Sequence, residues 1–356
     1  MQIENFYHDS VALLKRLIQT PSLSGQEDAA ANVIRENLEF SGIAYQSRMN
    51  NTWCFNKHWD NSKPVILLNS HIDTVKPVDG WTFDPFKATV QDRRLIGLGS
   101  NDAGGPLVAL MAVFKYFYNR RDLPFNLIFA ATAEEESSGP NGMALLVKQL
   151  KRVDFAIVGE PTQMNLAVAE KGLLVIDCTV KGKAGHAARE EGINSIYLAL
   201  DEIEKIRNFK FDKISPQLGP VKMTVTQIEA GFQHNVIPDI CKFVMDVRTN
   251  ECYSNDEVIE IISGLLNCEV CPRSRRLNSS GIEMDHPFVK KALSKGINCY
   301  GSPTLSDQSL MDYKSVKMGP GDSARSHTAN EYIFLDEIRL GIEKYVLLLE
   351  DLVLPD

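Results

Sequence analysis

One histidine and several carboxylates stand directly after apolar stretches of this sequence. His71 and Asp73 lie in NSHIDTV, just after the apolar run VILLN. Three consecutive glutamates, residues 134–136, follow the run LIFAA, and Glu160 follows DFAIVG. Imidazole and carboxylate groups together are ligands that zinc, manganese and cobalt accept. The residue types therefore indicate metal-assisted chemistry, and neither a GxSxG nucleophile motif nor an HExxH zinc motif occurs.

Asp102 and His327 extend this set from two glycine-containing segments, GLGSNDAGG and GPGDSARSHTANE. Each residue alone has an ordinary explanation, because aspartate favours helix N-caps and a glutamate run is commonly a solvated face. Several carboxylates brought together would repel one another, which raises their pKa values or destabilises the fold. A divalent cation removes that repulsion. We therefore predict a site for two divalent metal ions, most simply zinc, with cobalt or manganese as alternatives.

The apolar runs are the elements that must bring these groups together. The runs at 65–69, 127–131 and 154–158 are typical of strands buried on both faces, and 104–118 is long enough for a buried helix. Strands that alternate with helices favour an α/β fold with a mostly parallel sheet flanked by helices. Ligands bind beyond the carboxyl ends of such strands. The three strands are therefore expected to deliver their polar groups to one edge of the sheet.

The pattern changes near residue 172. Three alternating stretches between residues 173 and 249, and a short one near Glu269, indicate strands, and helical spacing falls between the first two and again after Ser254. The order strand-helix-strand-strand-helix-strand is the ferredoxin-like arrangement. We therefore predict a catalytic metal-binding domain formed by 1–171 and 283–356, with residues 172–282 inserted as a small ferredoxin-like α+β domain.

Composition and charge restrict the partners. The chain has 356 residues and a formal net charge of -8, which disfavours binding to nucleic acid or to an anionic membrane. No apolar run is long enough to span a bilayer. The first ten residues lack the basic and then apolar pattern of a signal peptide, and seven scattered cysteines fit free thiols. We therefore expect a cytoplasmic protein with neither nucleic acid nor membrane as a partner.

The motifs occur in the order of a known enzyme family. SHIDTV, GLGSNDAGG, ATAEEE, GEPT, GHAA and SHTANE together resemble the M20 family of metallopeptidases and deacylases over nearly the whole chain. The resemblance implies a zinc-peptidase-like fold and a small-molecule N-acyl amino acid as substrate. It also implies five metal ligands: His71 and Glu160 on one ion, Glu135 and His327 on the other, and Asp102 bridging both.

Two further carboxylates receive separate roles. The resemblance implies that Glu134 is the general base, which takes a proton from the attacking water and passes it to the leaving amine. Asp73 has a physical role of its own, because a metal-bound histidine usually donates its second N–H to a carboxylate, which fixes the tautomer. We therefore expect Asp73 to hold the ring of His71.

The resemblance also implies substrate-binding residues. His186 in KAGHAA resembles a histidine that hydrogen-bonds the tetrahedral oxyanion, often from a partner subunit, so a homodimer through the inserted domain is expected. Arg248 in MDVRTN resembles an arginine that grips the substrate carboxylate, a task that suits a bidentate guanidinium. Asn235 resembles a substrate-contacting asparagine, and the loop with Gly319 and Gly321 resembles one that lines the substrate.

The sequence departs from the family pattern beside Asp102, where Leu98 and Gly104 replace an arginine and a lysine. The resemblance implies an acetylornithine deacetylase of arginine biosynthesis, acting on N-acetyl- or N-succinyl-ornithine or -citrulline. Succinyl-diaminopimelate desuccinylase, acetyl-lysine deacetylase, and a dipeptidase or carboxypeptidase of the same family are alternatives. A catalytically inactive binding protein is disfavoured, because every matched position carries a chemically competent residue.

Overall fold

The computed structural model describes residues 2–189 and 191–354, which divide into two compact units. Unit 1 comprises Met1–Val168, Ile282–Tyr300 and Ser306–Asp356, and unit 2 comprises Ala169–Gly281 and Gly301–Leu305. The sequence pattern places the insertion at 172–282, whereas unit 2 begins at Ala169 and includes a short later segment. Hydrophobic periodicity does not reveal that segment, because it is too short to carry a repeat.

Unit 1 is built on a sheet whose central strands are parallel. β3 (Val65–His71) lies between β6 (Asn126–Thr132) and β7 (Phe155–Val158) and pairs in parallel with both, and β17 (Ser315–Lys317) follows beyond β7. Every residue of β3, β6 and β7 is buried, as is usual where both faces of a parallel sheet are covered. The expected parallel α/β core is therefore confirmed.

Other strands complete this sheet at its sides. β2 (Asn51–Phe55) lies beside β6, and β1 (Tyr45–Arg48) lies beyond β2. β8 (Leu166–Glu170) lies beside β17 and also pairs with β16 (Cys299–Ser302). A separate small sheet consists of β4 (Thr89–Gln91), β5 (Arg94–Ile96) and β18 (Tyr332–Phe334). β18 directly follows the segment that carries His327, so this small sheet anchors that segment to the chain before Asp102.

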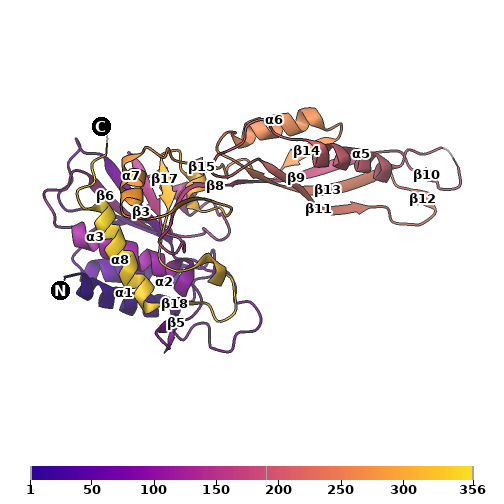
Figure 1. The fold of residues 1–356 in the computed structure, drawn as a ribbon. Helices are drawn as coiled ribbons and strands as arrows, with labels where there is room; N and C mark the ends of the chain where they lie inside the picture. The colour runs from indigo at the N-terminus through magenta and orange to yellow at the C-terminus, as the bar shows by residue number, and fades with distance from the viewer. Residues whose placement is uncertain (1, 190, 355–356) are drawn as a thin grey trace. The chain divides into compact units, whose positions relative to one another are not determined.

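Three long helices of unit 1 pack against one another. These are α1 (Gln2–Ile18), α3 (Gly105–Phe117) and α8 (Leu335–Leu349) (Figure 1), and α2 (Asp28–Phe40) packs on α1. Nearly all of α3 is buried, which explains its uniformly apolar sequence. The shorter helical segments are α4 (Met143–Leu146), α7 (Pro287–Ser294), η1 (Ser100–Gly104), η2 (Asp307–Leu310) and η3 (Ser323–Arg325).

Unit 2 contains an antiparallel sheet and two helices. Its strands are β9 (Gly172–Lys181), β11 (Lys222–Ala230), β13 (Ile240–Thr249) and β14 (Glu269–Pro272), in the spatial order β11-β13-β9-β14. α5 (Ser195–Asn208) and α6 (Asn255–Leu265) follow the first and third of these strands, which is the expected ferredoxin-like order. A capping box between Ser254 and Glu257 fixes the start of α6.

The remaining strands of the chain are short. β10 (Gly185–His186) pairs with β12 (Val236–Ile237), and β15 (Ser280–Gly281) pairs with β8. Among the described residues, no helix combines the length and the apolar character that crossing a membrane requires.

Candidate metal centre

The predicted ligands lie at the carboxyl ends of the central strands. His71 is the last residue of β3, the glutamates 134–136 follow β6 directly, and Glu160 comes two residues after the end of β7. Asp102 lies in η1 before α3, and His327 lies in the loop between η3 and β18. Parallel neighbouring strands end at one edge of the sheet, which places three of these segments together, as the sequence predicts.

The imidazole of His71 lies close to three of the carboxylates. Its Nε2 lies 3.3 Å from Asp102 Oδ1, 3.8 Å from Glu160 Oε1 and 4.0 Å from Glu135 Oε2. Its side chain is almost fully buried. The imidazole nitrogen and the carboxylate oxygens of His71, Glu135 and Glu160 all lie within 4.8 Å of one another, close enough for one metal ion to contact all three.

The glutamate that faces His327 is Glu136. His327 Nε2 lies 3.0 and 3.1 Å from the two carboxylate oxygens of Glu136 and 3.7 Å from Asp102 Oδ2. Glu136 also forms a second compact group with His71 and Asp102. The sequence prediction paired His327 with Glu135, so the structure differs from it by one residue within the glutamate run.

Glu134, the predicted general base, belongs to neither of these two groups of candidate ligands. Its carboxylate accepts hydrogen bonds from the backbone N–H of Asn141 at 3.0 Å and from Asn141 Nδ2 at 2.9 Å. Its backbone is left-handed, with φ 56°, so the chain turns immediately after β6. That turn directs Glu134 into the following loop and brings the next two glutamates to the cluster.

Asp73 connects two of the ligand segments. His71 Nδ1 lies 2.9 Å from the backbone carbonyl oxygen of Asp73 and 3.4 Å from its carboxylate. The Asp73 carboxylate itself accepts the backbone N–H groups of Glu135 and Glu136 at 3.1 and 3.0 Å. A proton on Nδ1 of His71 leaves Nε2 as the free ligand atom. The predicted carboxylate contact is thus supplemented by the carbonyl group, which is the nearer acceptor.

The cluster has the electrostatics of a site that needs positive charge. Burial raises the pKa of Glu160 to about 8, and negative neighbours add to the effect. Burial also raises the pKa of Glu135 well above its usual value. A hydrogen bond to Glu136 raises the pKa of His327 to about 9. Divalent cations would reverse these shifts, so the donor set and its burial fit metal ions.

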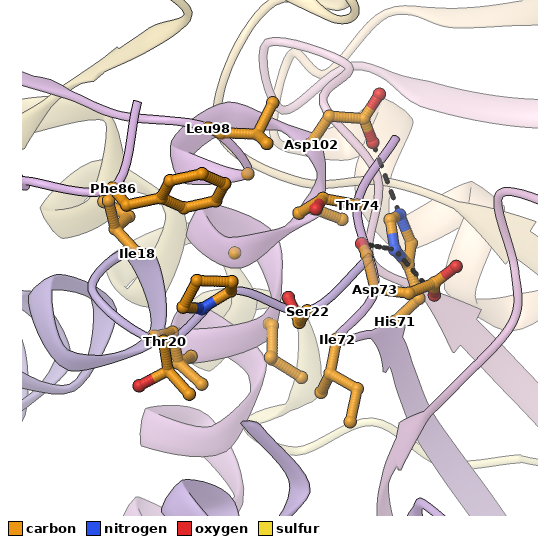
Figure 2. Close-up of a pocket in the computed structure, with 16 residues that line it drawn as sticks. Ile18, Thr20, Ser22, His71, Ile72, Asp73, Thr74, Phe86, Leu98 and Asp102 are labelled. Atoms are coloured by element: carbon orange, nitrogen blue, oxygen red, sulfur yellow. Dashed lines mark hydrogen bonds and ion pairs between the residues drawn. The ribbon is translucent and has the colours of Figure 1, made fainter. Parts of the chain in front are cut away.

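A small cavity lies behind the cluster. Figure 2 shows His71, Asp73 and Asp102 on one side of it and the apolar side chains of Phe86 and Leu98 on the other. Its volume of about 20 Å³ is enough for roughly one water molecule. The cavity is therefore too small for a substrate. Leu98, which departs from the family pattern, forms part of the apolar support behind the cluster.

The structure assigns packing functions to the glycines of this region. A Cβ at Gly104 would lie 2.4 Å from the carbonyl oxygen of Gly99, so the lysine of the family pattern has no room here. A Cβ at Gly319 would lie 2.5 Å from the carbonyl oxygen of Glu160, and Gly321 has φ +93°. The predicted contacts of Gly319 and Gly321 with substrate remain predictions.

Two buried carboxylates that sequence reasoning missed support the site. Asp307 Oδ2 accepts hydrogen bonds from Asn69 Nδ2 and Thr132 Oγ1, both at 2.8 Å, and so links β3 to β6. Burial raises the pKa of Asp307 to about 6. Glu331 accepts backbone N–H groups of the loop that carries Asp102. Its only sequence signal is its place in SHTANE, four residues after His327.

The other predicted substrate residues belong to unit 2. His186, at the end of β10, is exposed, and its Nδ1 accepts the N–H of Ala188 at 3.1 Å. Asn235 lies next to this segment, since its carbonyl oxygen accepts the N–H of Ala187. Arg248 donates from Nε and Nη2 to Asp246 on the same strand, at 2.9 and 3.1 Å. Unit 2 therefore brings His186 and Asn235 together, while Arg248 pairs with an acidic neighbour.

An α/β sheet with His71, Glu135, Glu136 and Glu160 at its strand ends, and with Asp102 and His327 on loops, is the arrangement expected of a metal-dependent hydrolase. The family model for peptidase family M20/M25/M40 matches residues 67–351. The chain therefore belongs to this family, as its motifs suggested.

Individual relatives agree with this membership. The succinyl-diaminopimelate desuccinylase of Orientia tsutsugamushi (strain Ikeda) is 26% identical over 347 residues, which cover 92% of this chain and 85% of that protein. The enzyme of the same name from Caulobacter sp. (strain K31) is 28% identical over 264 residues, covering 70% and 68%. A dinuclear metal-binding M20 peptidase from Bacillus subtilis has the same fold, with a TM-score of 0.74 at 18% identity over 97% of this chain and 98% of that one.

Proposed function

We propose that this protein hydrolyses the amide bond of an N-succinyl amino acid, as a desuccinylase of the succinyl-diaminopimelate type. The observation that carries the proposal is the similarity to desuccinylases along 92% of the chain, together with two compact groups of candidate metal ligands and His327 beside them. An acetylornithine deacetylase, the activity that the motifs first suggested, uses the same site chemistry and is the second candidate. The two differ in acyl group and amino acid.

The geometry supports a revised assignment of ligands. In this proposal His71 and Glu160 would hold one divalent ion, Glu136 and His327 would hold the other, and Asp102 would serve both. The distances from Asp102 to His71 and to His327, 3.3 and 3.7 Å, support its shared position. Zinc is the first choice for such a mixture of imidazole and carboxylate, with cobalt and manganese as alternatives.

Glu135 becomes the general base in place of Glu134. Metal ions bound at such a site lower the pKa of a water molecule and polarise the acyl oxygen. The Glu135 carboxylate reaches the cluster, with its Oε2 4.0 Å from His71 Nε2, and it does not face His327. In this proposal the Glu135 carboxylate takes a proton from the attacking water and then passes it to the leaving amine. Its backbone N–H is held by Asp73, which fixes its position.

Unit 2 supplies the proposed substrate contacts and subunit contacts. His186 is proposed to stabilise the oxyanion, Asn235 to contact the substrate, and Arg248 to bind its carboxylate in competition with Asp246. A homodimer through unit 2 is supported by exposed apolar side chains on it, among them Tyr197. The described cysteines are all free, which agrees with a cytoplasmic location.

A substrate panel with metal removal tests the proposed function. Hydrolysis of N-succinyl-diaminopimelate, N-succinylornithine, N-acetylornithine, N-acetylcitrulline and a dipeptide would be compared by kcat/KM. We expect the succinyl substrates to be preferred, activity to disappear after chelation, and activity to return with zinc or cobalt. Preference for N-acetylornithine would replace the proposal by the second candidate. Full activity after verified removal of metal would reject both.

A further inference from the structure

Glu331 forms three hydrogen bonds to the loop that carries Asp102. Its Oε1 accepts the backbone N–H groups of Asn101 and Asp102 at 2.8 and 2.9 Å, and its Oε2 accepts that of Gly99 at 3.1 Å. The side chain is only 2% exposed. Hydrogen bonds from backbone N–H groups to a carboxylate are among the strong ones in proteins, particularly away from water.

Further contacts join the same two segments. The backbone N–H of Gly97 donates to the carbonyl oxygen of Glu331 at 3.0 Å. Asn101 donates from Nδ2 to the carbonyl oxygen of Asp322 at 3.0 Å and to Ser326 Oγ at 3.3 Å. The Oδ1 of Asn101 accepts the N–H of Asp322 at 3.0 Å. Residues 97–102 are therefore attached to 322–331 on both sides of His327.

These contacts matter because the two segments carry the ligands that the central sheet does not fix. His71 ends β3, Glu136 follows β6, and Glu160 follows β7, so the parallel strands position those three. Asp102 and His327 lie on loops, and the distance between them depends on how the loops are joined. Among the described residues, Glu331 is the carboxylate of the His327 loop that accepts the backbone N–H of Asp102 together with those of Gly99 and Asn101 on its N-terminal side.

We propose that Glu331 is a positioning residue that holds Asp102 and His327 at the correct separation for the metal ion they share. This inference rests on the ligand assignment of the proposed function. The inference predicts that the two metal positions depend on Glu331 to different degrees. The ion held by Glu136, His327 and Asp102 depends on Glu331 through two ligands, whereas the ion held by His71, Glu160 and Asp102 depends on it through one.

The test is metal binding by Glu331→Gln, measured by calorimetric titration of the metal-free protein with zinc and, separately, with cobalt. Glutamine retains one acceptor oxygen but presents an NH2 group to a backbone N–H, so at least one bond is lost. We expect one of the two ions, which we assign to Glu136, His327 and Asp102, to lose affinity by about 10–100-fold, the usual effect of removing a partner that orients ligands. The other ion is expected to lose less.

Glu202→Gln is the matched control. Glu202 is also buried and also accepts a backbone N–H, from Asn267 at 2.8 Å, but it lies in α5 of unit 2. We expect it to bind both ions with wild-type affinity. Glu331→Gln with two wild-type affinities, or with an equal loss at both sites, would overturn the proposal.

A second variant covers the case in which Glu331→Gln does not fold. Asn101→Ser removes the side-chain bonds to Asp322 and leaves the Glu331 carboxylate in place. We expect a smaller loss in the same ion, and wild-type binding would count against the inference. Failure of the proposed function has a different signature, because the wild-type protein would then bind two ions and hydrolyse none of the N-acyl substrates.

Discussion

At the scale of single residues, neighbouring glutamates of the run 134–136 make different contacts. Glu134, Glu135 and Glu136 are chemically identical, yet Glu134 bonds to Asn141 while Glu136 faces His327. The left-handed backbone of Glu134, at φ 56°, produces this difference. A non-glycine residue in that conformation is uncommon and is often found near functional sites.

The register of the run gives a direct prediction for catalysis. Glu135→Gln removes the proposed base while retaining the shape of the side chain, so kcat is expected to fall by about 100–10,000-fold with both metal ions still bound. Glu134→Gln is the comparison, because its carboxylate is occupied by Asn141 outside the cluster. Steady-state kinetics with metal analysis of both variants makes the measurement. A larger loss of kcat in Glu134→Gln than in Glu135→Gln would support Glu134 as the general base, as the motifs suggested.

The raised pKa values predict how pH affects the metal-free protein. Burial raises the pKa of Glu160 from its ordinary 4.5 to about 8, and the hydrogen bond with Glu136 raises the pKa of His327 from 6.5 to about 9. Folding therefore takes up protons between these values, so the associated stability is present at low pH and is lost as pH rises through about 8 to 9. Metal ions compete with those protons, so their affinity rises over the same range.

Thermal unfolding with and without zinc at pH 6, 7, 8 and 9 checks this expectation. The melting temperature of the metal-free protein should fall with increasing pH, and the increase caused by zinc should grow. The His327→Gln variant should show a weaker dependence, because one of the titrating groups is removed. A melting temperature of the metal-free protein that rises over this range would contradict the electrostatic description of the cluster.

At the scale of elements, the site depends on strand ends and on close approach of loops. β3, β6 and β7 are parallel neighbours, so their carboxyl ends present His71, the glutamate run and Glu160 at one edge. Within the segment before α3, the backbone folds back on itself so closely at Gly104 that there is no room for a Cβ atom. Gly104 packs where a Cβ would lie 2.4 Å from the carbonyl oxygen of Gly99.

Gly104→Ala is therefore expected to displace the loop that carries Asp102. The added Cβ meets backbone, which yields less readily than a side chain, so we expect a loss of about 1–3 kcal/mol in the free energy of unfolding and reduced metal content. Gly264→Ala in α6 is the control, since a Cβ there meets nothing within 4 Å. It should be neutral or slightly stabilising, because alanine is the better helix former. Denaturant unfolding and metal analysis distinguish the two variants.

At the scale of the whole molecule, the chain combines a metal-binding α/β unit with an inserted unit that has a separate hydrophobic core. Unit 2 exposes large apolar side chains on α5, including Tyr197 and Leu200. Exposed apolar groups of this kind often mark contact surfaces between proteins. The same unit carries His186 at the end of β10, and subunit contact through unit 2 remains a prediction.

Subunit association gives the prediction at this scale. Tyr197 is 69% exposed on α5, and Tyr197→Asp places a charge on the proposed interface, so we expect the dimer to dissociate at concentrations where the wild-type protein remains paired. Phe40→Asp, at a 94% exposed position of unit 1, should leave association unchanged. Sedimentation velocity over a range of concentrations makes the comparison. A monomeric wild-type protein would remove the basis for a partner's contribution to the site.

The sequence by itself determined the parallel sheet, the ferredoxin-like insertion and the ligand types at three strand ends, because apolar runs and their periodicity follow directly from burial. It could not determine which glutamate faces His327, since β6 ends at Thr132 and the backbone turn after it leaves no periodic signal. Nor could it reveal that Glu331 bonds the loop of Asp102, a contact between residues 229 positions or more apart. Those features depend on backbone torsions and long-range hydrogen bonds, which only the tertiary structure specifies.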